Sequence, residues 1–175
     1  MNYWAETLID SVLAVAFMSE GLRQHDLSLT AALATILLGL LIFSFMEYCF
    51  HRWMFHGTVV RLKQGHAVHH IHPQGYDALP FFFPPLVLMG LTGAFSRFLP
   101  LHLTFLLSGA IAFGYVTYGL SHFLIHHKRF HNAIARKWAS HHHIHHHHPD
   151  CNFGVTTPLW DAILGTRYAA KHKQV

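Results

Sequence analysis

The sequence predicts an all-α fold, a multi-pass membrane helical bundle with a cytoplasmic His-rich helical cap. Three observations lead to this prediction. Hydrophobic residues make up 52% of the 175 residues and charged residues only 11%, which leaves too little polar surface for a water-soluble protein of this size. Long uncharged stretches recur along the chain. The 20 histidines equal the 12 basic and 8 acidic residues combined, and they are clustered.

Three stretches are long and apolar enough to be strong membrane spans. Residues 27–46 carry no formal charge, and a helix of that length, at about 1.5 Å per residue, crosses the roughly 30 Å hydrocarbon layer. Residues 78–96 are interrupted early by prolines. Residues 98–121 follow after a connection that allows only a tight helical hairpin. At this length we expect one membrane-embedded domain over residues 1–175.

The N-terminal segment is a weaker candidate. Glu6, Asp10 and Glu20 leave only residues 11–19 uncharged, so residues 4–19 predict either a short tilted span or an interfacial helix. The early acidic residues and the lack of a basic region are not typical of a cleaved signal peptide.

All histidine clusters emerge on one side of the predicted bilayer. The first strong span ends near His51, the second begins after His72 and the third ends at His122. The same side receives ten of the twelve basic residues, and only Arg23 and Arg97 lie opposite. The positive-inside rule makes that side cytoplasmic, on the inner membrane of a bacterium or the endoplasmic reticulum of a eukaryote. The formal charge of +4 then reflects topology, and we expect no nucleic-acid partner.

Four groups of histidines are the candidate site. They are His51 with His56, then His66, His69 and His70, then His122, His126 and His127, and finally the tract at residues 141–148. Residues three and four apart share a helix face, so the second group is expected to converge on one point, as is His122 with His126. His51 and His56 are five apart, so they either straddle two metal ions or sit where a helix ends.

The number and type of these side chains predict two metal ions. Imidazole nitrogens suit iron, zinc and copper, and ten candidate imidazoles exceed what one ion can hold. Two registers of the last tract fit the H-x-x-H-H spacing, one with His142, His145 and His146 and one with His143, His146 and His147. A metal-buffering tract is the alternative, although such a tract needs no spacing.

Two carboxylates are candidate partners of the histidines. Glu47 lies one turn before His51, and Asp161 follows the last tract in a short helix that we expect between Thr157 and Gly165. Ligating imidazoles usually donate their second ring proton to a carboxylate or carbonyl. A helix-local contact is an equally good interpretation of each carboxylate.

The ordered motifs resemble the fatty acid hydroxylase / sterol desaturase superfamily over about residues 47–166. The similarity rests on Glu47-Tyr48-x-x-His51-Arg52-x-x-Phe55-His56, His66-x-x-His69-His70, Ser121-His122-x-x-x-His126-His127 and the last His box with Asn152-Phe153-Gly154. The resemblance implies a non-haem dimetal monooxygenase with no catalytic residues beyond its metal ligands. The ligands that it implies are His51, His56, His66, His69, His70, His122, His126, His142, His145 and His146. Many members carry an Asp before the third box, where this chain has Gly119.

The resemblance implies O2-dependent hydroxylation of a fatty acyl chain at a centre of the di-iron type. Zinc has no redox chemistry, so iron is expected for activity, although zinc could be the ion bound. The alternative is a carotenoid-ring or sterol hydroxylase or desaturase. A non-catalytic metal-binding membrane protein is less favoured, because the strong spans hold almost no polar residues. No haem-attachment motif or Gly-rich dinucleotide turn is present, so we expect a separate electron-donor protein.

Overall fold

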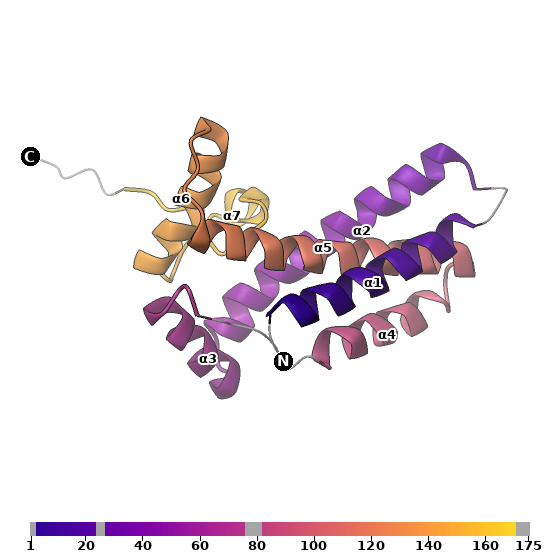
Figure 1. Cartoon of the computed structure of the whole chain (residues 1–175), viewed down its shortest axis with the longest axis horizontal. Helices are drawn as coiled ribbons and strands as arrows, with labels where there is room; N and C mark the ends of the chain where they lie inside the picture. The colour runs from indigo at the N-terminus through magenta and orange to yellow at the C-terminus, as the bar shows by residue number, and fades with distance from the viewer. Residues whose placement is uncertain (1–2, 24–26, 76–81, 171–175) are drawn as a thin grey trace, which may run out of the picture. The chain divides into compact units, whose positions relative to one another are not determined.

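The computed structural model describes residues 3–23, 27–75 and 82–170, and every regular element within them is a helix. The elements in chain order are α1 (Tyr3–Leu22), α2 (Leu29–Cys49), η1 (Phe50–Phe55), α3 (Val60–Ile71), α4 (Phe83–Phe95), α5 (Leu101–His127), α6 (Ala133–His147) and α7 (Leu159–Ile163) (Figure 1). The predicted all-α class is confirmed for this part of the chain.

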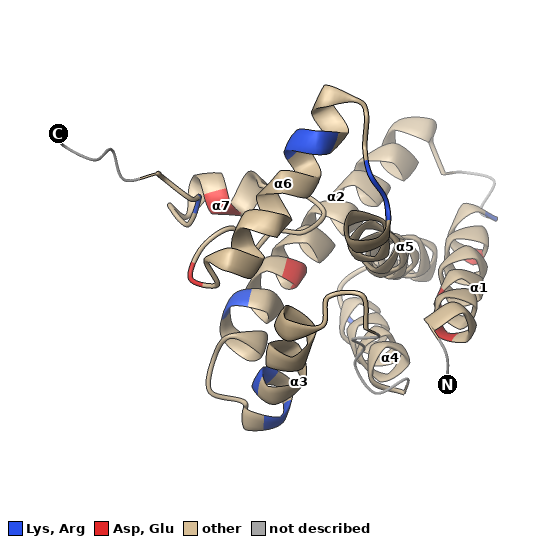
Figure 2. Ribbon diagram, turned by 60° about the vertical axis from the view of Figure 1, so that its left-hand side comes forward, with Lys and Arg blue, Asp and Glu red and all other residues tan. Residues whose placement is uncertain are grey.

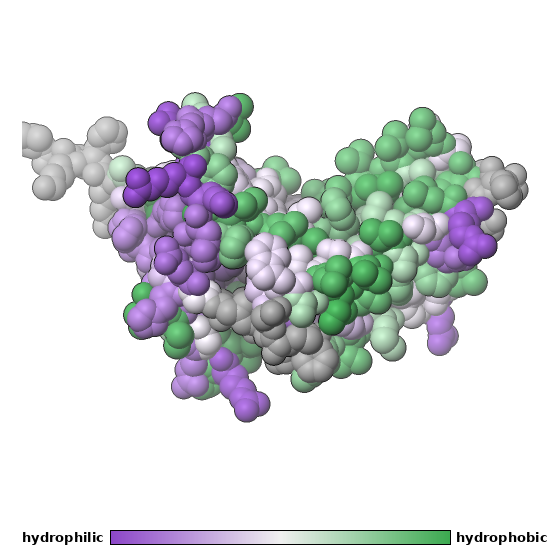
Figure 3. Space-filling view, viewed as in Figure 1, coloured by the Kyte–Doolittle hydropathy of each residue, from purple (hydrophilic) through white to green (hydrophobic). Residues whose placement is uncertain are grey.

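The chain divides into two compact units. Unit one comprises Met1–Ser44 and Tyr76–Leu120, and unit two comprises Phe45–Gly75 and Ser121–Val175. On the face shown in Figure 3, hydrophobic residues dominate the surface of unit one, whereas hydrophilic residues gather over α3 and α6 of unit two. The single membrane-embedded domain stays a prediction.

Small residues allow the helices of unit one to approach closely. Ala14 of α1, Leu88 of α4 and Ala112 of α5 form one buried cluster. A Cβ atom at Gly39 of α2 would lie 2.6 Å from the Cβ atom of Ala110. Such contacts are typical of helices that pack without a hydrophobic driving force.

Within the described residues, two helical stretches are long and apolar enough to cross a membrane. They are Leu29–Phe55 and Leu101–His127, each of 27 residues, and they contain most of the first and third predicted spans. The second predicted span differs, because α4 has only 13 residues, about 20 Å of helix. Prolines start this helix, and residues 78–81 of the predicted span lie outside the described residues. A third strong span and a cytoplasmic cap therefore stay predictions.

Unit two begins in the last turn of α2, which continues directly into the π-helix η1. In η1 the backbone N–H of His56 donates to the carbonyl of His51 at 3.2 Å, a bond that spans five residues.

Further along unit two, Asn132 caps α6, because its side chain accepts hydrogen bonds from the N–H groups of Ile134 and Ala135. The five-residue α7 confirms the short helix expected after Thr157, and Gly165 follows it at φ +70°. Basic residues lie on α3 and α6 (Figure 2).

Candidate metal centre

Ten histidines of unit two form two groups of five. Group one is His51, His56, His66, His70 and His145, and group two is His69, His122, His126, His142 and His146. Within each group, one ring nitrogen of every histidine lies within 4.8 Å of the others. Each group could therefore hold a metal ion.

These ten residues are the ligand set that the resemblance implied. The structure brings together the register with His142, His145 and His146, while His143 and His147 of the other register are exposed on α6. His127 of the third box lies outside both groups and donates from Nδ1 to the carbonyl of Phe123 at 2.9 Å. Their role as metal ligands stays a prediction.

The H-x-x-H-H motif divides its histidines between the two groups. His66 and His70 of α3 enter group one, whereas His69 enters group two. The expectation that all three converge on one point is wrong. His69 and His70 are consecutive residues, so they lie about 100° apart around the helix axis. Helix α6 has the same spacing but the opposite assignment, with His142 and His146 in group two and His145 in group one.

The π-helix places His51 and His56 in the same group. Both belong to group one, so the interpretation that they straddle two ions is wrong. The other interpretation is confirmed, since His56 directly follows the end of η1. Hydrogen bonds that span five residues bring side chains five apart onto one face, and such π turns recur at functional sites.

The Nε2 atoms meet at distances that hydrogen bonding alone cannot explain. The Nε2 atom of His66 lies 3.0 Å from that of His51 and 3.1 Å from that of His70. The Nε2 atom of His142 likewise lies 3.1 Å from those of His126 and His146. A neutral ring nitrogen carries either one proton or one lone pair, so it cannot satisfy both neighbours.

A metal ion bound within each group would account for this spacing. At a metal–nitrogen distance of about 2.1 Å, ligands at right angles lie about 3.0 Å apart, whereas tetrahedral ligands lie about 3.4 Å apart. The observed 3.0–3.1 Å therefore matches the separation of two neighbouring imidazoles that would share one ion. The donor set of five imidazoles suits a first-row transition metal.

Burial lowers the pKa of several imidazoles in the two groups. Burial and then the imidazole of His70 lower the pKa of His146 to about 2. Burial lowers the pKa of His145 to about 3, against the raising effect of its hydrogen bond to the Cys151 carbonyl. The pKa of His56 is lowered to about 3, first by burial and then by the nearby imidazole of His66. Neutral imidazoles offer the lone pair that a metal ion needs.

Two backbone carbonyls set the tautomers of two rings in group one. His51 donates from Nδ1 to the carbonyl of Phe153, and His145 donates from Nδ1 to the carbonyl of Cys151 at 2.7 Å. A carbonyl only accepts, so Nδ1 carries the proton in both rings and Nε2 keeps its lone pair. Both Nε2 atoms thereby point their lone pairs into group one.

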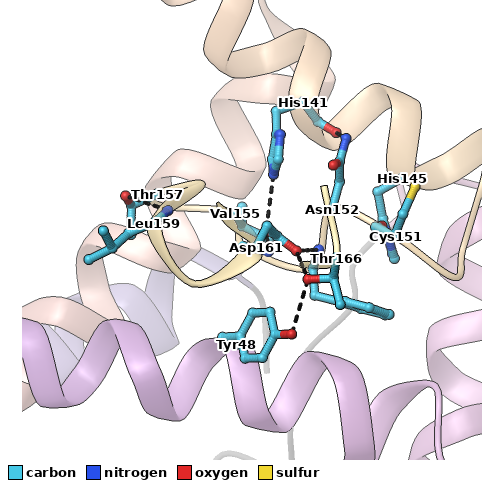
Figure 4. A network of polar contacts seen from close by, with 12 residues as sticks. Tyr48, His141, His145, Cys151, Asn152, Val155, Thr157, Leu159, Asp161 and Thr166 are labelled. Atoms are coloured by element: carbon cyan, nitrogen blue, oxygen red, sulfur yellow. Dashed lines mark hydrogen bonds and ion pairs between the residues drawn. The ribbon is translucent and has the colours of Figure 1, made fainter. Parts of the chain in front are cut away.

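The two candidate carboxylates contact the segment after the last His box. Glu47 accepts hydrogen bonds from the backbone N–H groups of Val155 and Thr156 at 2.6 and 3.0 Å, so it binds this segment, a partner that neither interpretation of Glu47 from the sequence included. Asp161 pairs with His141 at 3.0 Å (Figure 4), a histidine outside both groups. Burial alone would raise the pKa of Asp161, but its hydrogen bonds, led by that from His141, lower it below the ordinary value. Sequence reasoning missed His141 because nothing distinguished it within the tract.

The chain matches the sequence profile of one protein family. The profile is described as fatty acid hydroxylase, and it matches residues 36–166. A dihydroceramide fatty acyl 2-hydroxylase of Arabidopsis thaliana is 31% identical over 85% of this chain and 64% of its own length. A second one from the same plant is 28% identical over 94% of this chain and 73% of its length.

Similarity extends to animal proteins and to a solved structure. The fatty acid 2-hydroxylase of Homo sapiens is 30% identical over 71% of this chain and 37% of its own length. The chain thus spans less than two thirds of several of its curated relatives. A structure described as full-length scs7p, with only the hydroxylase domain visible, matches 98% of this chain and 69% of its own with a TM-score of 0.83 at 24% identity. That likeness supports the fold.

Proposed function

Because the chain belongs to the fatty acid hydroxylase family, we propose that it hydroxylates a fatty acyl chain at a pair of metal ions held by groups one and two. The observation that supports this most directly is the meeting of Nε2 atoms at 3.0–3.1 Å in both groups. Hydrogen bonding between the rings does not explain this spacing, because one ring nitrogen cannot pair with two neighbouring Nε2 atoms. These imidazoles are suited to bind two transition-metal ions side by side.

The overall reaction requires a co-reactant. Insertion of one oxygen atom of O2 into a C–H bond gives an alcohol and water, and it consumes two electrons and two protons. When bound, a pair of iron ions would supply the reduction of O2 and the oxidation of the C–H bond. The chain's own residues would hold the ions, and the carbonyls of Cys151 and Phe153 keep a proton on Nδ1 of His145 and His51 by accepting hydrogen bonds from them. A separate protein is the proposed electron donor.

The proposed substrate is the acyl chain of a membrane lipid, hydroxylated at carbon 2. The relatives described above are named as 2-hydroxylases of fatty acids or of fatty acyl groups in dihydroceramide. Two apolar helices long enough to cross a bilayer support a membrane location. We further propose that the metal centre faces the cytoplasm, as the distribution of basic residues predicts.

Analysis of lipids under labelled oxygen tests the proposal. The full chain and its His142→Ala variant would be expressed in a host that lacks 2-hydroxy fatty acids, and hydrolysed lipids would be analysed by mass spectrometry. We expect 2-hydroxy fatty acids carrying one 18O atom with the unaltered chain and at least a 100-fold lower amount with the variant. A hydroxylated carotenoid or sterol in their place would favour the alternative substrates.

A second histidine of the same tract provides the control. His147 lies five residues further along α6, is exposed and belongs to neither group. The His147→Ala variant should retain the activity of the unaltered chain. Equal product from all three proteins, or none from any at matched expression, would contradict the proposed reaction.

A further inference from the structure

The loop at residues 151–156 contacts the metal centre through its backbone. The carbonyls of Cys151 and Phe153 accept hydrogen bonds from Nδ1 of His145 and His51, and both of these rings belong to group one. Group two differs at His142, whose Nδ1 atom is buried and has no hydrogen-bond partner among the described residues. The loop therefore orients two rings of group one through hydrogen bonds that the sequence motifs do not reveal.

Four consecutive amides of this loop point at two carboxylates. The N–H groups of Phe153 and Gly154 each donate to Asp161 at 2.8 Å, one to each carboxylate oxygen. The next two N–H groups, of Val155 and Thr156, both donate to a single oxygen of Glu47. Asp161 is fully buried. Hydrogen bonds from amides to a charged carboxylate are about twice as strong as those between neutral groups. The two carboxylates thus fix the direction of the Phe153 carbonyl.

The surroundings of Asp161 hold it in one orientation. Thr166 donates its hydroxyl proton to Asp161 at 2.7 Å, so Tyr48, at 3.0 Å from the Thr166 hydroxyl, must donate to it. The hydroxyl of Tyr48 in turn accepts from Arg52 at 2.8 Å. Figure 4 shows Tyr48, Thr166, Asp161 and His141 joined in this way. Four donors, two on each oxygen, leave Asp161 no freedom to turn.

The conformation of the loop leaves little room for adjustment. Asn152 adopts a left-handed φ of +56°, which few residues other than glycine tolerate. A Cβ atom at Gly154 would lie 2.1 Å from the carbonyl oxygen of Thr157. A loop this constrained transmits a displacement of its amides to its carbonyls.

We propose that Asp161 is a positioning residue for the metal ion of group one. It acts through the amides of Phe153 and Gly154 on the Phe153 carbonyl, and through that carbonyl on the ring of His51. This inference rests on the proposed two-metal centre. It predicts that the two ions are unequal in their dependence on Asp161.

The two carboxylates provide a matched pair of isosteric variants. In Asp161→Asn, the new NH2 group faces a backbone N–H whichever way the amide turns, because both oxygens accept one. In Glu47→Gln, the amide oxygen can keep both backbone contacts while the NH2 group faces the hydroxyl of Thr156, which can accept. The first variant should disturb the loop, and the second should preserve it.

Cobalt titration of single-site backgrounds tests the inference. His126→Ala weakens group two and reports on the ion of group one, whereas His56→Ala does the reverse. Each full-length background would be purified, freed of metal and titrated with Co²⁺, and binding would be followed by d–d absorption and metal analysis. We expect Asp161→Asn to weaken binding 10- to 100-fold in the His126→Ala background and less than about 3-fold in the His56→Ala background. Glu47→Gln should change neither by more than about 3-fold.

Three results would overturn the inference. Equal weakening in both backgrounds would make Asp161 a general support of unit two. Unchanged affinity in both would mean that the loop does not control the ring of His51. Failure of the unaltered chain to bind any ion would remove the proposed metal centre as well, so the two failures are distinguishable.

Discussion

The two units of this chain differ in the polar groups that they bury. Unit one buries mainly apolar residues, such as Ala14 and Leu106, while other large ones such as Leu37 remain exposed. Unit two buries ionisable side chains beside its apolar residues, and both His145 and Asp161 are 0% exposed. Unit one is therefore specified by steric fit between helices, and unit two by hydrogen bonds and by the ions that we propose. A change in unit one should therefore affect stability alone, whereas a change in unit two should also affect metal binding.

Removal of metal should have the largest effect, and it should act through unit two. Each ion stabilises the folded state by about 4 kcal/mol when its concentration is 1,000 times its dissociation constant. Thermal unfolding in detergent, with and without chelator, measures this contribution. We expect the chelator to lower the melting temperature of the unaltered chain substantially.

The same measurement on His126→Ala sharpens the comparison. This variant loses a member of group two only, so the chelator should produce about half of the shift seen with the unaltered chain. A chelator without effect on the unaltered chain would argue against bound metal in unit two.

Crowding at a helix contact should be the next largest effect, confined to unit one. Leucine at Gly39 would place its Cβ atom 2.6 Å from that of Ala110 and 2.9 Å from the carbonyl oxygen of Leu107. We expect Gly39→Leu to destabilise the protein by roughly 1–3 kcal/mol. Metal content per folded chain, measured by mass spectrometry, should not change.

Gly90 is the matched control for that substitution. Beyond its own helix backbone and chain neighbours, no atom of the described residues lies within 4 Å of a Cβ placed there, and alanine is the better helix former by about 1 kcal/mol. Gly90→Ala should therefore leave stability unchanged or raise it. A loss similar to that of Gly39→Leu would show that close approach is not the cause.

Acid should destabilise the chelated protein through unit two. The folded pKa of His56 and His145 is about 3, below the ordinary 6.5, so the folded state binds fewer protons than the unfolded state. Stability from these groups is fully present above about pH 6.5 and is lost as the pH falls toward 3. Melting curves at pH 7, 6 and 5 should show a falling melting temperature, less steep in His56→Gln. Equal slopes for the two proteins would contradict the assignment to His56.

Loss of one hydrogen bond to the loop should have the smallest effect. The indole N–H of Trp138 donates to the carbonyl of Val155 at 2.8 Å. Trp138→Phe removes this donor and should cost about 1 kcal/mol of unfolding free energy. Both ions should remain bound, because the two carboxylates still hold the loop amides. Release of an ion by this variant would mean that the loop is less constrained than its contacts indicate.

Residue type and spacing predicted two of the long helices and most of the imidazoles of the site. Uncharged stretches predicted α2 and α5. Spacing left two registers open in the last tract, and only the family resemblance implied the one with His142, His145 and His146 that the structure brings together. These features follow from side-chain identity, which a sequence states directly. The use of α3 and α6 by both groups follows from helix geometry, but it requires knowing where each partner ring lies.

Other features of the site depend on backbone conformation. The π-helix that joins His51 to His56 has no distinctive residue, and the carbonyls of Cys151 and Phe153 are present in every amino acid. Glu47 and Asp161 were recognisable as carboxylates near histidines, but their amide partners were not. Tertiary contacts over about a hundred residues, such as that between Glu47 and Val155, cannot be read from local pattern.

Anomalous X-ray diffraction from crystals of the metal-loaded chain tests the two-ion centre most directly. We predict two peaks in the anomalous difference map, each about 2.1 Å from Nε2 atoms of one group of five histidines. A single peak, or peaks bound by His143 and His147 in place of His142 and His146, would contradict the proposed centre.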